Sequence, residues 1–130
     1  MKLENTITEM VLGADAKALA TMSQGDINVV PVSTVKVVDD AVILVNYFMG
    51  KTLENIQDNP EVALVCWKGL GGYQIKGTVD YETDGERFIA IKNWVSEILP
   101  ERIVKGILVL HPREIFDISA TAEKPGSRIM

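Results

Sequence analysis

The stretch from Asn28 to Pro60 constrains the fold of this chain more than any other part of its sequence. Apolar, mostly β-branched residues dominate it up to Val38 and again from Ala41, and such residues favour the half-buried surface of a pleated sheet. Asp39 and Asp40, which separate the two segments, are typical turn residues. The stretch therefore predicts two strands joined by a tight turn, followed by a corner and a short helix.

The corner after the second strand carries the residues that most suggest a binding site. The strand ends in Asn46-Tyr47, the backbone is expected to turn at Gly50, and a helix is predicted from Lys51 until Asn59-Pro60 stops it. The first turn of a helix has unpaired N–H groups and a partial positive charge, so it attracts anions. A lysine and the Thr52 hydroxyl at the same place predict a seat for a phosphate group.

Several other chemistries are excluded or disfavoured by the sequence. Gly50-Lys51-Thr52 imitates the end of a P-loop, but that motif requires an upstream glycine where this chain has Val45, so an NTPase is excluded. The net charge of −5 argues against a nucleic-acid partner. His111 is the only histidine and has no acidic or sulfur neighbours in sequence, which argues against a metal site. No side chain stands out as a catalytic acid, base or nucleophile.

Strands dominate the rest of the chain. Helices are predicted from Leu3 to Leu12 and from about Thr83 to Leu99. Strands at short intervals with one helical corner indicate a small closed antiparallel barrel rather than a parallel sheet. We therefore expect a mainly β (β + α) fold of six or seven strands with two to three flanking helices. Besides the strand after Asp40, the predicted strands are Ala16–Ser23, Ile27–Val38, Glu61–Lys68, Tyr73–Glu82, Gly106–Leu110 and Glu114–Ile118.

Two of these predicted strands have unusual features. Pro31 cannot donate to a sheet ladder, so it predicts an edge, a bulge or a local opening within the long strand Ile27–Val38. Glu61–Lys68 is apolar almost throughout, which predicts a strand covered on both faces. Cys66 within it is interpreted as a small buried hydrophobe, and as the only cysteine it excludes an internal disulfide.

The length of 130 residues is that of one ordinary domain, which we predict over residues 1–118. The polar tail, residues 119–130, is expected to be either disordered or docked on a partner subunit. No apolar run approaches membrane-spanning length, and the N-terminus lacks the apolar core of a signal peptide. A cytoplasmic location with no membrane partner is the default expectation.

The corner also carries a resemblance to a known family. After the strand come Asn46-Tyr47 and Gly50-Lys51-Thr52, then Leu53-x-x-Ile56-x-x-Asn59-Pro60, and then the strand Val62-Ala63-Leu64-Val65. This arrangement resembles the FMN-binding split-barrel family, which includes the pyridoxamine 5′-phosphate oxidases, small FMN-binding proteins and flavin reductases. The resemblance covers roughly residues 16–80 and implies a split β-barrel.

The resemblance implies a set of cofactor-binding residues. The family's phosphate-binding basic residue and its neighbour fall on Lys51 and Thr52. Larger members commonly have two basic residues here, whereas this chain has one and a hydroxyl, as the small FMN-binding members do. Residues 30–34 would lie under the flavin ring, where backbone released from the ladder can meet the polar ring edges. The full set of expected contacts is Val30, Pro31, Val32, Ser33, Thr34, Asn46, Tyr47, Gly50, Lys51, Thr52, Asn55 and Gln74.

The implied function is that of an FMN-binding redox carrier or a small FMN-dependent oxidoreductase, with a small molecule or a protein as its electron donor or acceptor. The family binds its flavin at a homodimer interface, where the second subunit adds an aromatic or apolar cover. Trp67, Trp94 and Tyr73 are the large aromatic candidates for that cover. Two alternatives stay open: the same fold holding a deazaflavin, haem or a pyridoxal-type phosphate, or a cofactor-free barrel that serves as an interaction module.

Overall fold

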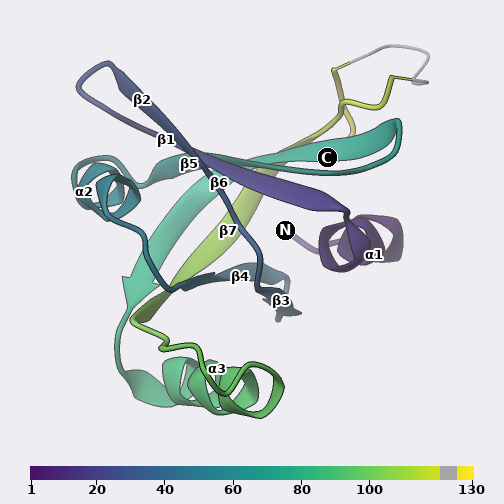
Figure 1. The fold of residues 1–130 in the computed structure, drawn as a ribbon. Coiled ribbons are helices and arrows are strands. Elements are labelled where there is room, and N and C mark those ends of the chain that lie inside the picture. The colour runs from purple at the N-terminus through teal and green to yellow at the C-terminus, as the bar shows by residue number, and fades with distance from the viewer. Residues whose placement is uncertain (121–125) are drawn as a thin grey trace.

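Eight strands and three helices are present in the residues that the computed structural model describes, 1–120 and 126–130 (Figure 1). The predicted mainly β fold with flanking helices is confirmed. In chain order the elements are α1 (Asn5–Gly13), β1 (Ala16–Ser23), β2 (Asp26–Pro31), β3 (Val35–Val38), β4 (Ala41–Asn46), α2 (Lys51–Asp58), β5 (Glu61–Lys68), β6 (Gly71–Glu82), α3 (Gly85–Ile98), β7 (Gly106–Asp117) and β8 (Ser127–Arg128).

All of the strands form one antiparallel sheet. Its order is β2-β1-β5-β6-β7-β4-β3, and the two-residue β8 pairs with β7. The two edge strands, β2 and β3, follow each other in the chain, so residues 32–34 carry the backbone from one edge to the other (Figure 1). Within the described residues no ladder joins these edges. The sheet is therefore split rather than closed, which corrects the expectation of a closed barrel and agrees with a split barrel.

The break between β2 and β3 lies where the sequence places Pro31. The predicted long strand Ile27–Val38 is two strands, because β2 ends at Pro31 and β3 begins at Val35. At either end of the break the backbone makes single bonds to other strands: the Val32 N–H donates to the Lys17 carbonyl over 3.0 Å, and the Val45 N–H donates to the Thr34 carbonyl over 3.2 Å. Of the three alternatives predicted for Pro31, an edge and a local opening are both observed, since β2 is an edge strand that ends at Pro31.

The predicted strands Gly106–Leu110 and Glu114–Ile118 are one continuous strand, β7. Pro112 does not end it, because the neighbouring ladder shifts register there: Gly77 faces Pro112, whereas Lys76 faces Glu114. One residue of β7, Arg113, is thus left without a partner and forms a bulge. At a bulge the ladder is already interrupted, so the missing N–H of Pro112 costs no regular hydrogen bond. The two errors in strand number offset each other, since one predicted strand is divided and two are merged.

Two hydrophobic cores lie on opposite faces of the sheet. Residues of α1 such as Ile7 and Val11 pack with Leu44 and Leu64 in the first core, whereas Ile91 of α3 packs with residues of β4 and β7 in the second. Side chains alternate along a strand, so β4 and β7 contribute to both cores. The prediction that Glu61–Lys68 is covered on both faces is wrong, because β5 buries only alternate residues. β4 is buried on both faces along its whole length, and β7 is so from Gly106 to Leu110.

The end of the tail lies against its own sheet. The Ile129 N–H donates to the Ile115 carbonyl over 2.8 Å, and the Met130 side chain packs on the first core. Residues 121–125 lie outside the described residues, and docking of the tail on a partner subunit stays a prediction. Within the described ranges, no helix combines the length and the apolar character needed to cross a bilayer.

Candidate functional site

A cavity of about 330 Å³ lies where the chain leaves β2 and where α2 begins. It is a suitable size for part of a cofactor, since ligand pockets typically measure roughly 300–1,000 Å³. Eight of the expected contact residues line it: Val30, Pro31, Val32, Ser33, Tyr47, Gly50, Lys51 and Thr52. The structure therefore brings together the two segments that the sequence singled out separately, the broken strand and the helical corner.

Polar contacts with the β1–β2 hairpin hold α2 in place beside this cavity. The Asn28 amide donates to the Thr52 hydroxyl over 3.0 Å, and the Asn55 amide donates to the Thr21 hydroxyl over the same distance. Thr21, Thr52 and Asn55 are almost completely buried, where an unmade hydrogen bond is costly. These two bonds therefore fix the first turn of α2 relative to β2.

The start of α2 presents positive charge and backbone donors to the cavity. The N–H groups of Leu53 and Glu54 bond back to the Gly50 carbonyl at 3.1 and 3.3 Å. The N–H groups of Lys51 and Thr52 precede them and have no acceptor within the helix. The Lys51 ammonium lies 3.3 Å from the Asp26 carboxylate, and both side chains are about half exposed or more, at 48% and 65%. An incoming anion would compete with Asp26 for this lysine.

Asn46 has a positioning role rather than a place in the cavity wall. Its amide donates to the Tyr81 hydroxyl over 2.9 Å, and its carbonyl accepts from the Met49 N–H over 2.7 Å. Asn46 therefore joins β6 to the loop that leads into α2. Gly106 makes this possible, because a Cβ there would lie only 2.2 Å from the Tyr81 hydroxyl oxygen.

Tyr81→Phe is expected to lower the free energy of unfolding by about 1–2 kcal/mol, because it leaves the buried Asn46 amide without an acceptor. Urea unfolding followed by circular dichroism measures the change. Tyr73→Phe is the matched control, since the Tyr73 hydroxyl takes part in none of the side-chain hydrogen bonds of the described residues. Equal losses in the two variants would show that the Tyr81 hydroxyl has no such role.

Three further expected contacts do not line the cavity either. The Thr34 hydroxyl accepts from the Tyr47 hydroxyl over 2.9 Å in a buried contact that orients the Tyr47 ring. Asn55 faces β1, and its side-chain carbonyl has no hydrogen-bond partner in the described residues. Gln74 lies on β6, three strands across the sheet from Pro31. A role for Gln74 toward a cofactor held by another subunit stays a prediction.

Four cavity residues were missed by the sequence analysis: Val45, Phe48, Met49 and Arg102. The first three adjoin predicted residues, so their position in the corner was an available signal. Arg102 had no such signal, because it lies in the loop after α3. Its guanidinium lies 5.4 Å from the centre of the Tyr47 ring, a cation–π distance. None of the aromatic candidates Trp67, Trp94 and Tyr73 lines the cavity of its own chain.

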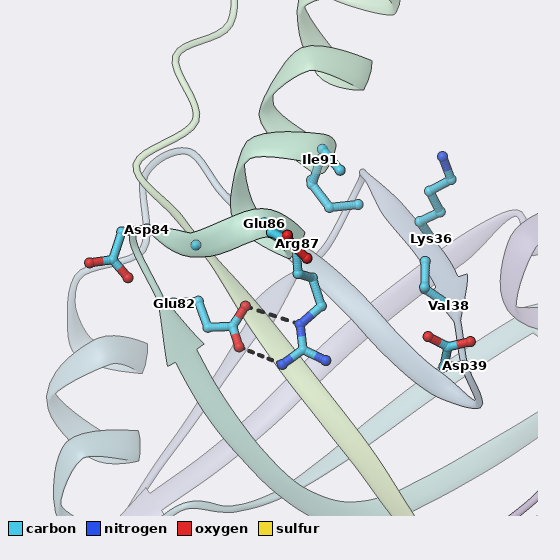
Figure 2. Close-up of a pocket in the computed structure, with 10 residues that line it drawn as sticks. Lys36, Val38, Asp39, Glu82, Asp84, Glu86, Arg87 and Ile91 are labelled. Atoms are coloured by element: carbon cyan, nitrogen blue, oxygen red, sulfur yellow. Dashed lines mark hydrogen bonds and ion pairs between the residues drawn. The ribbon is translucent and has the colours of Figure 1, made fainter.

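A larger cavity, of about 680 Å³, lies elsewhere, between the β3–β4 turn and the start of α3. Figure 2 shows the Arg87 side chain extended toward Glu82, with which it forms a bidentate ion pair. Hydrogen bonding to Arg87 holds the pKa of the Glu82 carboxyl below its ordinary value. The charged side chains that line this 680 Å³ cavity are mostly solvated, and no aromatic residue is among them. No buried polar atom is left unpaired there. The 330 Å³ cavity at the start of α2 is therefore the better candidate site.

The remaining reactive side chains also lie outside the candidate site. Cys66 is fully buried in the first core, as predicted, and burial raises the pKa of its thiol. His111 is exposed on β7, with its Nε2 atom 3.0 Å from the Asp80 carboxylate. The described residues contain no group of three or more His, Cys, Asp or Glu side chains arranged to hold a metal ion.

Comparisons with known proteins give one family match and one related sequence. Residues 3–123 match the family model for pyridoxamine 5′-phosphate oxidase. An uncharacterized protein of Methanocaldococcus jannaschii is 36% identical to this chain over 109 residues, which cover 78% of this chain and 72% of that protein.

Three solved structures have the same fold. HupZ of Group A Streptococcus has a TM-score of 0.84 at 21% identity, covering 98% of this chain and 99% of its own. An FMN-binding protein from Syntrophomonas wolfei has a TM-score of 0.77 at 17% identity, covering 89% and 86%. The haem storage protein HutZ of Vibrio cholerae has a TM-score of 0.69 at 19% identity, covering 92% and 97%. At these identities the likeness shows the fold alone.

Proposed function

The chain belongs to the pyridoxamine 5′-phosphate oxidase family, and from this membership and the geometry of the α2 corner we propose that it binds FMN. It would act as a redox carrier or as a small FMN-dependent oxidoreductase. The flavin, when bound, supplies the electron or hydride transfer. The residues of the chain hold the cofactor, exclude water from it and tune its environment.

One observation supports this proposal above all: the start of α2, where a phosphate would bind, and the end of the broken strand β2 line the same cavity. Lys51, Thr52 and the first N–H groups of α2 would bind the phosphate. At the other wall, the β2 ladder ends at Pro31, and the Ser33 amide that follows lies between the two backbone groups, of Val32 and Thr34, that bond to neighbouring strands. Main-chain groups released in this way suit the polar edge of a flavin ring.

A homodimer is part of the proposal, because exposed apolar side chains lie at the cavity, on the neighbouring loop and on the edge strand β2. Phe48 is 80% exposed and Ile103 is 77% exposed, and Ile27 and Val29 on the edge strand β2 are also exposed. Exposed apolar side chains that cluster beside a pocket mark an interaction surface. A second copy of the chain would cover them and complete the cofactor site. Sedimentation equilibrium is expected to give twice the chain mass of 14.3 kDa.

Haem is the alternative cofactor, since HutZ of Vibrio cholerae is a haem storage protein with this fold. A haem iron held by a histidine would require His111, the only histidine of the chain. His111 pairs with Asp80 and does not line the candidate cavity. This placement favours FMN. A deazaflavin or a pyridoxal-type phosphate could bind at the same place at the start of α2. A cofactor-free interaction module remains the third alternative.

The test is the identity of the molecule that accompanies the purified protein. We expect a yellow protein, FMN in the mass spectrum of the released ligand, and a titration in which FMN binds more tightly than riboflavin. Haem or a deazaflavin in that spectrum would assign the alternative cofactor. A colourless protein that does not respond to added FMN would contradict the proposal and favour the interaction module.

Asp26→Asn is expected to tighten FMN binding by roughly threefold, because it frees the exposed Lys51 from a weak ion pair that the phosphate must displace. Riboflavin binding should not change, since riboflavin has no phosphate. Fluorescence titration measures both dissociation constants. Asp84→Asn, which removes an exposed carboxylate beside the other cavity, is the matched control. Unchanged or weaker FMN binding in Asp26→Asn would show that Lys51 does not bind the phosphate.

A further inference from the structure

Two residues of the edge strand β2 contact the two side chains at the start of α2. The Asp26 carboxylate lies 3.3 Å from the Lys51 ammonium, and the Asn28 amide donates to the Thr52 hydroxyl over 3.0 Å. Asp26 and Asn28 are two positions apart, and alternate residues of a strand point to the same side. One side of β2 therefore sets the surroundings of both side chains that the proposed function assigns to the phosphate.

The Thr52 side chain is fixed in place, and only part of its hydrogen-bonding capacity is used. It is completely buried, and a β-branched side chain has few rotamers in a helix. A hydroxyl can both accept and donate. Thr52 accepts from Asn28, whereas within residues 1–120 and 126–130 its own proton is donated to no side chain or carbonyl. Because Thr52 lines the 330 Å³ cavity, this proton is available to an acceptor there.

Asn28 affects this cavity only indirectly, because it is half-buried beside α2 and does not line the cavity itself. Its amide donates to the Thr52 oxygen, so the hydroxyl proton must point in another direction. A carboxylate at position 28 would do the opposite, since it can only accept and would take that proton. The chemical identity of residue 28 therefore decides whether Thr52 offers a donor or an acceptor to the cavity.

We propose that Asn28 is a positioning residue for phosphate recognition, which holds the Thr52 hydroxyl so that its proton points into the cavity. The oxygens of an ionised phosphate are strong acceptors, so a directed donor suits them. Lys51 and the helix start attract anions in general, whereas the Thr52 hydroxyl adds a bond of fixed direction. This inference rests on the proposed function, because it concerns the same phosphate.

The test is a double-mutant cycle on the ratio of FMN to riboflavin affinity, measured by fluorescence titration. Thr52→Val should lower this ratio roughly tenfold, because it removes a donor to a charged group. Asn28→Leu should lower it roughly threefold, because the hydroxyl then has no fixed direction. In the Thr52→Val background, Asn28→Leu should have no further effect on the ratio, because Asn28 acts only through the Thr52 hydroxyl.

Thr21→Val is the matched control, because it removes a bond of the same 3.0 Å length between the same helix and the same hairpin. Thr21 and its partner Asn55 do not line the cavity, so the affinity ratio should stay unchanged although the protein is less stable. Asn28→Asp is a second variant that keeps the size of the side chain. Its carboxylate would take the Thr52 proton, so it should lower the ratio further than Asn28→Leu does.

Several results would overturn the inference. Equal weakening of FMN and riboflavin in Asn28→Leu would make Asn28 a structural residue only, and an unchanged ratio in Thr52→Val would remove both residues from phosphate recognition. A loss that persists in the Thr52→Val background would show that Asn28 contacts the phosphate directly. An unchanged ratio in Asn28→Asp would show that residue 28 accepts from Thr52 rather than donates to it.

Inorganic phosphate separates this inference from the cofactor proposal, because its binding needs no flavin. Its affinity is measured from the ¹H–¹⁵N signals of residues 51 and 52 in the same four proteins of the cycle. If the protein binds no FMN, a loss of phosphate affinity in Asn28→Leu that disappears in the Thr52→Val background would support the role of Asn28 while contradicting the cofactor. Phosphate that leaves both signals unchanged in such a protein would overturn both proposals.

Discussion

Lys51→Gln is expected to weaken FMN binding by roughly 10–30-fold, while riboflavin binding changes less than twofold. The physical reason is that Lys51 supplies the only side-chain cation at the start of α2, and a charge-assisted bond to a phosphate is worth about 1.5–2 kcal/mol. Glutamine keeps the length of the side chain and its helix propensity, so the fold should not change. Fluorescence titration of both flavins measures the two dissociation constants.

Lys68→Gln is the control for this prediction, because it removes an exposed lysine at the end of β5, outside the cavity. The remaining FMN affinity of Lys51→Gln should come from the backbone N–H groups of α2, which no side-chain substitution removes. Equal weakening of FMN and riboflavin would mean that Lys51 affects the cavity generally and does not bind the phosphate.

Gly77→Ala is expected to lower the free energy of unfolding by about 3 kcal/mol or more, a large part of the total for a small domain. A Cβ at this position would lie 2.1 Å from the His111 carbonyl oxygen, an atom of the backbone that no rotamer change can move away. The sheet can accept the methyl group only if β6 and β7 separate where their register shifts. Urea unfolding and the thermal midpoint measure the effect.

Gly13→Ala is the matched control for the glycine substitution. Apart from its chain neighbours and the backbone of its own helix, no atom lies within 4 Å of a Cβ built at Gly13, so this variant should keep its stability within about 0.5 kcal/mol or gain slightly. A Gly77→Ala protein as stable as Gly13→Ala would show that the two strands are not so close at the bulge. Both variants should bind FMN where they are folded, because neither glycine lines the cavity.

The α2 corner could be predicted from sequence because its signals are local. The turn at Gly50, the helix start at Lys51 and the stop before Pro60 each depend on a few neighbouring residues, and the structure places α2 at Lys51–Asp58. The opening after Pro31 was predicted for the same reason, since the missing N–H of a proline interrupts the strand ladder at the proline itself. Pro112 shows the limit of such reasoning: a bulge lets β7 continue through it.

The positioning role of Asn46 could not be predicted, although the residue itself was singled out. The family resemblance implied that its side chain faces the cofactor, yet in the structure it bonds to Tyr81 and to the Met49 N–H. Tyr81 lies far from Asn46 in sequence and meets it only because β4 and β6 both flank β7. Contacts between distant segments depend on the strand order, which no local pattern states.

The sequence by itself determined the kinds of elements, the helical corner at Gly50 and Lys51 and the opening beside Pro31, because these depend on backbone preferences of adjacent residues. Only the tertiary structure decided which strand is covered on both faces. The apolar sequences of β4 and β5 are similar, but α3 packs over β4 and leaves Trp67 of β5 partly exposed. It also decided that Arg102 and Lys105 lie beside the corner, because long-range packing, and not local sequence, folds their loop onto the end of β4.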